Sequence, residues 1–99
     1  MEQASNGSQE RLYRIIAAVE SVEECRALLL DLCTVRELEE MGQRLSAAFL
    51  LSEGKNYQDI SGATGLSTAT ISRVSKALKS GSGYKRAIER ETDGGRTEA

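Results

Sequence analysis

Apolar residues in the first half of the chain recur every three or four positions, which is the period of an amphipathic helix. The spacing predicts three helices between Arg11 and Ser52, and no segment shows the alternation typical of a strand. Capping boxes at Ser21–Glu24 and Thr34–Glu37 indicate where the second and third helices begin, because a hydroxyl and a carboxylate at this spacing accept hydrogen bonds from free amides. The apolar faces comprise Leu12, Ile15, Ile16 and Val19, then Val22, Cys25, Leu28, Leu29 and Leu32, then Val35, Leu38, Met41, Leu45, Ala48, Phe49 and Leu51.

The second half of the chain predicts two shorter helices joined by a glycine turn, and then a last short helix over residues 84–90. Asn56 can cap the first of the pair, and Gly65 offers the left-handed backbone position that ends it. Ser67 or Thr68 can cap the second helix of the pair, which we expect to end at the Ser-Gly-Ser-Gly run that begins at residue 80.

The fold class that these elements predict is all-α, with six helices in one domain of residues 9–91. The polar stretches 1–8 and 92–99 are expected to be disordered tails. The first three helices carry more leucine than one small domain needs to cover, and a chain of 99 residues buries only a modest fraction of its surface. A second copy of the chain would cover this surplus, so we expect a homodimer.

Residues 57–80 have the layout of a helix-turn-helix, which places its second helix in the major groove of DNA. Small residues at 61–63 allow the two helices to approach closely, while Thr64 is less apolar than this position favours. The apolar side chains expected where the helices cross are Ile60, Leu66, Ile71 and Val74.

The second helix of this motif offers two kinds of DNA contact. The positions expected to be exposed, with those nearest the N-terminus meeting base edges, are Thr68, Ala69, Thr70, Ser72, Arg73 and Lys76. Most of these side chains are short, so we expect sparse direct readout, with water bridges and DNA shape adding specificity. The residues best placed for phosphate contacts are Lys76, Lys79, Lys85 and Arg86.

The distribution of charge supports this interpretation although the formal net charge is −2. Residues 1–66 hold 6 basic and 11 acidic residues, and residues 67–99 hold 7 basic and 4 acidic residues. The basic excess therefore coincides with the helix that is expected to enter the groove, which favours binding to double-stranded DNA.

Other functional classes find little support in the composition. The chain has no histidine and no cysteine or carboxylate cluster with metal-ligand spacing, so we expect neither a metal site nor an enzyme. Cys25 and Cys33 fall in apolar helical sequence and are interpreted as small buried residues. No apolar run approaches the length of a membrane span, and the N-terminus lacks the pattern of a signal peptide, so a cytoplasmic protein is expected.

The segment 38–78 resembles the Trp repressor superfamily, and most closely the Trp repressor-like YerC/YecD group of bacterial proteins. The run ATISR-x-S-x-x-L at residues 69–78 is similar to the helix with which the repressor reads DNA. The resemblance implies an intertwined, all-helical homodimer with two reading heads. It also implies a transcriptional regulator, most simply a repressor, that binds a near-palindromic operator.

The resemblance further implies a ligand pocket between reading head and core, at Thr34, Arg44, Arg73, Val74 and Ala77. Thr34, Arg44 and Arg73 match residues that hold tryptophan in the repressor. Val74 stands where the repressor has glycine beside the indole, and Ala77 replaces a serine that receives the ligand's amino group. Tryptophan is therefore not expected as a corepressor. The alternatives are another small anion or amino acid, or no corepressor at all, with Val74 filling the space.

One other function fits the same residues. A helix-turn-helix can dock another protein without binding specific DNA, and the overall negative charge and short side chains of residues 68–72 are compatible with this use. The alternative hypothesis to a DNA-binding regulator is therefore a protein-interaction module.

Overall fold

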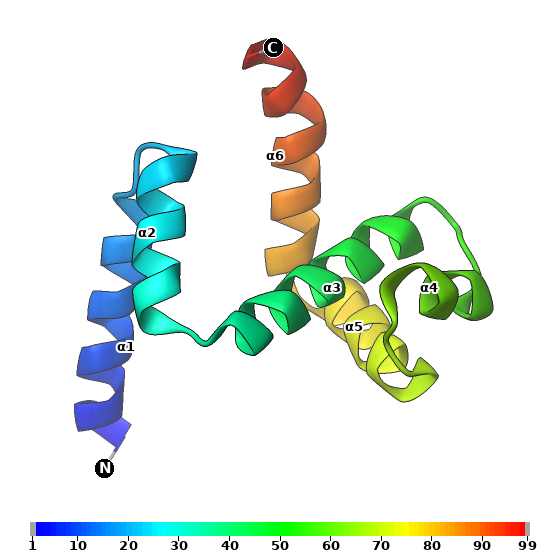
Figure 1. Cartoon of the computed structure of the whole chain (residues 1–99), viewed down its shortest axis with the longest axis horizontal. Helices are drawn as coiled ribbons and strands as arrows, with labels where there is room; N and C mark the ends of the chain where they lie inside the picture. Colours follow the sequence, from blue (N-terminus) through cyan, green and yellow to red (C-terminus); the bar gives the residue numbers. More distant parts are fainter. Residues whose placement is uncertain (1, 99) are drawn as a thin grey trace. The chain divides into compact units, whose positions relative to one another are not determined.

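The computed structural model describes the backbone of residues 2–98 and the side chains of residues 7–93. The chain folds into helices joined by short connections, and residues 2–98 contain no strand, which confirms the predicted all-α class (Figure 1). The six helices are α1 (Glu2–Ala17), α2 (Val22–Leu32), α3 (Val35–Ser52), α4 (Tyr57–Thr64), α5 (Thr68–Ser80) and α6 (Gly83–Glu98).

The two tails that we predicted to be disordered are helical in the structure. Helix α1 already begins at Glu2, and α6 continues to Glu98, whereas Met1 and Ala99 lie outside the described residues. Neither tail contains proline. Glycine lowers helix propensity by about 1 kcal/mol relative to alanine but keeps its amide donor, so a polar glycine-containing segment does not force a helix to stop.

Tertiary contacts divide the chain into two compact units, Met1–Leu38 and Glu39–Ala99. We describe the two units separately, and the single domain of residues 9–91 stays a prediction. None of the helices described over residues 2–98 combines the length and apolar character that crossing a bilayer would require.

The first unit holds α1, α2 and the start of α3, and its helix caps follow the predicted capping boxes. The Glu24 amide donates to Ser21 Oγ over 3.0 Å, and Glu24 Oε1 accepts from the Glu20 amide over 3.1 Å. At the start of α3 the box is reciprocal: the Glu37 amide donates to Thr34 Oγ1 over 3.0 Å, and the Thr34 amide donates to Glu37 Oε1 over 2.8 Å.

Large apolar side chains of this unit remain exposed. Helix α2 has no buried residue, and Val22 and Val35 are 71% and 67% exposed. The two cysteines are free and only half-buried, so their interpretation as buried residues was wrong. The physical reason is the same for all of them: within the first unit, α1, α2 and the start of α3 do not bury this apolar face. The exposed apolar residues of the unit are Leu12, Tyr13, Ile15, Ile16, Val22, Leu30, Leu32 and Val35.

The second unit contains the hydrophobic core. Ala47 and Ala48 of α3, Ile60 of α4 and Ile71 of α5 are fully buried. Fully burying each isoleucine contributes about 1.5–3 kcal/mol. The remaining members of the core are Leu66 and Val74, with Leu50, Leu51, Tyr84 and Ile88 packed against it. The four apolar residues predicted at the helix crossing are thus all confirmed as core.

Candidate nucleic-acid interface

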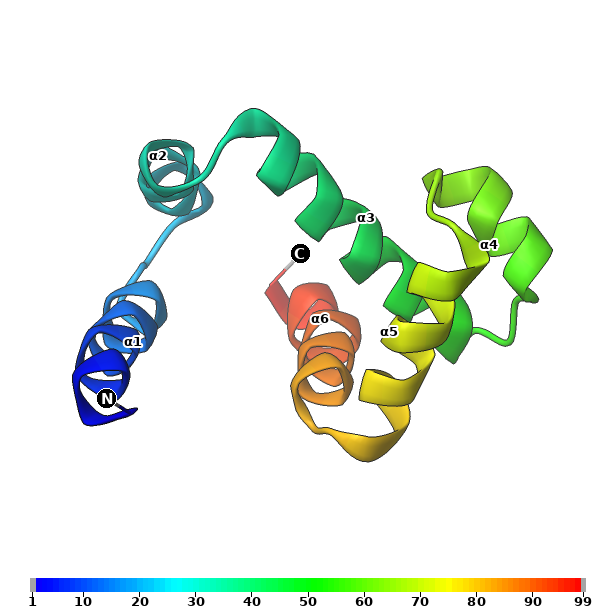
Figure 2. The ribbon, with the colours of Figure 1, turned by 90° about the horizontal axis from the view of Figure 1, so that it is seen from below.

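Helices α4 and α5 form a helix-turn-helix (Figure 2), and capping bonds fix the ends of both helices. Asn56 Oδ1 accepts from the Asp59 amide over 2.8 Å at the start of α4. Gly65 ends α4 with a φ of 82°, a left-handed conformation that a side chain would strain. Ser67 caps α5, because its Oγ accepts from the Thr70 amide over 3.1 Å. The predicted caps and turn glycine are therefore confirmed.

Two hydroxyl groups at the turn were missed by the sequence analysis. Thr64, which we predicted only to be less apolar than this position favours, is buried. Its hydroxyl donates one hydrogen bond and accepts another. Ser61 was considered only for its small size, yet its Oγ donates to the Leu66 carbonyl over 2.7 Å. A serine or threonine in the last turn of a helix that precedes a glycine is the sequence signal that points to such bonds.

The outward face of α5 carries most of the residues predicted to contact DNA. The side chains of Thr68, Ala69, Ser72, Arg73, Lys76 and Lys79 are exposed. Thr70 is only half-buried rather than exposed, because its Oγ1 accepts a hydrogen bond from Ser67 Oγ over 3.1 Å and so turns toward the cap. The opposite face of α5, with Ile71, Val74 and Ser75, is buried. Helix α5 therefore presents a polar surface while its apolar side anchors it.

The charge on α5 is of one sign. Arg73, Lys76 and Lys79 are its ionisable residues, and it contains no acidic residue. Lys85 and Arg86 follow in the first turns of α6 and are exposed as well, beyond the two-residue connection at positions 81–82. Helices α5 and α6 are in contact within the unit. These five basic residues thus lie on α5 and α6, two consecutive helices that contact each other.

The residues of the implied ligand pocket have different environments. Val74 is 3% exposed and belongs to the core, so its isopropyl group is enclosed by protein atoms. Arg44 is half-buried, whereas Arg73 and Ala77 are exposed. Thr34 belongs to the other unit, and its hydroxyl accepts the capping bond from the Glu37 amide.

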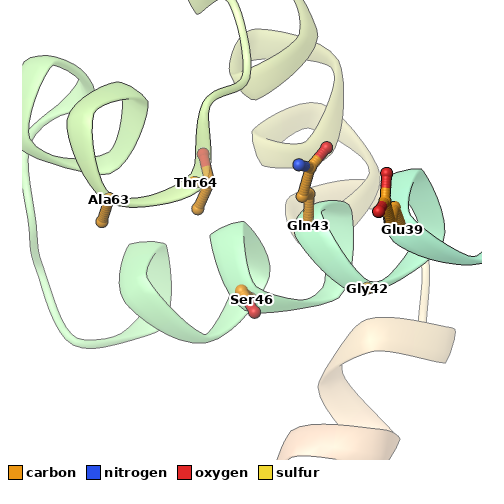
Figure 3. Close-up of a pocket in the computed structure, with 6 residues that line it drawn as sticks. All are labelled: Glu39, Gly42, Gln43, Ser46, Ala63 and Thr64. Atoms are coloured by element: carbon orange, nitrogen blue, oxygen red, sulfur yellow. The ribbon is translucent and has the colours of Figure 1, made fainter. Parts of the chain in front are cut away.

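A separate pocket of about 570 Å³ lies between α3 and α4, and the sequence analysis did not anticipate it (Figure 3). Glu39, Gln43 and Ser46 follow one another along α3, and Ala63 and Thr64 come from the end of α4 (Figure 3). The lining residues of the pocket are Glu39, Gly42, Gln43, Ser46, Ala63 and Thr64. Over the part of the chain that the structure describes, no group of three or more cysteine and carboxylate side chains could hold a metal ion.

Comparisons with known proteins place this geometry in a family. Residues 8–92 match the model of the family described as Trp repressor protein. The chain is 42% identical over 82 residues to the protein YerC of Bacillus subtilis (strain 168), an alignment that covers 82% of this chain and 79% of YerC.

Solved structures agree with the sequence comparison. The crystal structure of a TrpR-like protein from Eubacterium eligens ATCC 27750 superposes with a TM-score of 0.85 at 35% identity, covering 94% of this chain and 97% of that one. The crystal structure of a second protein, from Staphylococcus aureus, has a TM-score of 0.81 at 37% identity and 87% coverage of both chains. With its helix-turn-helix and six-helix fold, the chain belongs to the Trp repressor protein family.

Proposed function

We propose that this protein is a homodimeric, sequence-specific DNA-binding regulator of transcription, most simply a repressor, that reads a near-palindromic operator through the major groove. The observation that carries the proposal is the surface of α5. Its exposed side chains are short and polar at the N-terminal end and basic further along, with no carboxylate among them. A helix with this surface can approach the polyanionic groove without repulsion.

The residues divide into two roles along α5. Thr68 and Ala69, in its first turn, are expected to meet base edges, where Ala69 can contact a thymine methyl group. Ser72 and the partly covered Thr70 can bind bases through bridging water molecules. The basic residues are expected to contact phosphates and to set the register of the helix, and they are Arg73, Lys76, Lys79, Lys85 and Arg86.

The homodimer is supported by the apolar surface that the first unit leaves uncovered. Residues such as Tyr13, Val22 and Leu32 are more than half exposed in the protomer. Soluble proteins seldom leave so many large apolar side chains in water, and a second copy would bury them in a shared core. Two symmetric α5 helices would then read half-sites about one helical turn, roughly 34 Å, apart.

Tryptophan is not expected to control this binding. Val74 is buried in the core, where its isopropyl group stands in place of the glycine that lies beside the indole in the repressor, and the methyl group of Ala77 offers no acceptor for an amino group. We expect the reading heads to be held by the protein's own contacts, so that DNA binding does not require a corepressor. Another small anion or amino acid at Arg44 and Arg73 remains the alternative that a screen of metabolites would detect.

A salt titration of DNA binding tests the electrostatic part of the proposal. Each phosphate contact releases counterions, so log K should fall linearly with log salt, with a slope of about 0.9 per contact. If affinity for DNA is the same at low and moderate salt, phosphate contact is not its source and the proposal fails.

A protein-interaction module is the second candidate, favoured by the net charge of −2 and the short side chains at the start of α5. The double substitution Lys76→Ala with Lys79→Ala distinguishes the two functions. Loss of DNA binding by a variant that remains dimeric supports the regulator, and unchanged retention on DNA supports the module. The family consists of regulators, and we propose no catalytic activity for this chain.

A further inference from the structure

Leu66, the residue between the turn glycine and the cap of α5, is fixed at three points. Its amide donates to Thr64 Oγ1 over 3.2 Å, and its carbonyl accepts from Ser61 Oγ over 2.7 Å. Its side chain is 9% exposed and belongs to the hydrophobic core. Both backbone groups of this one residue are therefore bonded to side chains of the preceding helix α4.

The Thr64 hydroxyl both donates and accepts in this arrangement. It donates to the Ile60 carbonyl over 2.8 Å while it accepts from the Leu66 amide, and Thr64 itself is 9% exposed. The Gly65 amide donates to the Ser61 carbonyl over 2.9 Å, so it is not available to replace either bond. A helix-turn-helix needs only a glycine at the turn and apolar residues at the crossing. The two hydroxyl groups supply a restraint beyond that need.

The restraint acts on the start of the reading helix. Ser67, which caps α5, follows Leu66 directly, and Thr68 and Ala69 come next. Any shift of Leu66 therefore displaces the first turn of α5, where contacts with bases are expected. Contacts of this kind depend on supporting groups that hold the contacting residues to within about 0.5 Å.

We propose that Ser61 and Thr64 are positioning residues for sequence readout: together they clamp the backbone of Leu66 and so fix the N-terminus of α5 for DNA. The inference rests on the proposed function, and it adds that the turn is held in its DNA-reading geometry by the chain's own hydroxyl groups. Neither side chain needs to touch DNA.

The test uses two variants that each lose one of the hydroxyl groups. Thr64→Val keeps the shape of the side chain, and Ser61→Ala shortens it to a methyl group. Thr64→Ser restores the hydroxyl and is the rescue variant. Ser52→Ala is the matched control, because Ser52 Oγ also donates to a backbone carbonyl over 2.7 Å, that of Phe49 within α3, but lies away from the turn. All are made in the full-length chain.

The affinity of each variant is measured for two DNA duplexes, at a temperature well below unfolding. One is the duplex of about 20 base pairs that the wild-type protein enriches from a random pool, and the other is a scrambled duplex of the same composition. We expect Thr64→Val and Ser61→Ala to bind the enriched duplex about tenfold more weakly, the effect of one lost hydrogen bond, and the scrambled duplex nearly as well as wild type. Thr64→Ser and Ser52→Ala should bind both duplexes like wild type.

Amide hydrogen exchange supplies a second measurement that does not require DNA. The Leu66 amide should exchange slowly in the wild type and Thr64→Ser, and at least about tenfold faster in Thr64→Val. Ser61→Ala keeps the test decisive if Thr64→Val does not fold, because Ser61 is only partly buried.

Three results would overturn the inference. The first is that both hydroxyl-deficient variants bind the enriched duplex with wild-type affinity. The second is that they lose affinity equally for the enriched and the scrambled duplex. A merely structural role of the hydroxyl groups would produce one or the other of these results. The third is unchanged exchange of the Leu66 amide in Thr64→Val. If the wild-type protein enriches no duplex, the proposed function fails instead, and the exchange measurement still decides whether the clamp exists.

Discussion

Replacing Val74 by glycine should both destabilise the protein and reveal whether this side chain excludes tryptophan. Val74 is 3% exposed in the core, so its substitution removes buried carbon atoms rather than surface. Val74→Gly removes three buried carbon atoms, the β carbon and two methyl groups, which costs about 2.4 kcal/mol at about 0.8 kcal/mol per buried carbon, before any cavity is counted. Glycine within a helix adds about 1 kcal/mol, so we expect Val74→Gly to lower the free energy of unfolding by about 3 kcal/mol.

Urea denaturation measures this loss, at one protein concentration for all variants because the stability of a dimer depends on concentration. Val74→Ala is the control, since it creates most of the cavity without the backbone effect of glycine. We expect it to cost about 2 kcal/mol. A loss below about 0.5 kcal/mol in both variants would be typical of a surface position and would contradict the packing of Val74.

Calorimetric titration with tryptophan gives the functional half of the prediction. The wild-type protein should release no heat of binding, and Val74→Gly should gain measurable affinity, because the space beside Arg73 becomes available to a ring. If Val74→Gly remains folded and still binds no tryptophan, Val74 is not what excludes that ligand.

The remaining predictions concern DNA contact, assembly and folding. The Lys76→Ala and Lys79→Ala double variant should weaken DNA binding and reduce the salt slope by about 0.9 for each phosphate that the protein no longer neutralises, whereas Arg26→Ala in α2 should leave the slope unchanged. An unchanged slope in the double variant would contradict phosphate contact. Ile16→Glu should convert the proposed dimer to monomers in sedimentation, since Ile16 is 41% exposed on the apolar face of the first unit, and a persistent dimer at the same concentration would refute this role. Asn56→Ala should lower the free energy of unfolding by about 1 kcal/mol through loss of the α4 cap, and an unchanged value would show that the cap contributes nothing.

The sequence was sufficient to predict local structure wherever one residue acts on its neighbours. The Thr34–Glu37 capping box, the Asn56 cap and the left-handed turn at Gly65 all form as expected, because each needs only residues within three or four positions. The helical period was also enough to identify Ile60 and Ile71 as core.

Features that depend on tertiary surroundings were not predictable in the same way. Thr64 looked like an imperfect core residue because its burial depends on packing by other elements, although both hydrogen bonds of its hydroxyl are to residues within four positions. Cys25 lies in α2 and Cys33 is the residue that caps its end, and the first unit leaves both of them only half-buried. The polar segments at both ends of the chain predicted disorder, so the predicted first and last helices are shorter than α1 and α6. No proline interrupts these segments, and both helices continue through them.

The central claim is that a dimer of this protein reads DNA by sequence, and selection of bound duplexes from a random pool tests it most directly. The account predicts enrichment of a near-palindromic sequence whose two half-sites lie about 10 base pairs apart, centre to centre, in the absence of any added small molecule. Failure to enrich any sequence, with the protein folded and dimeric, would contradict the claim.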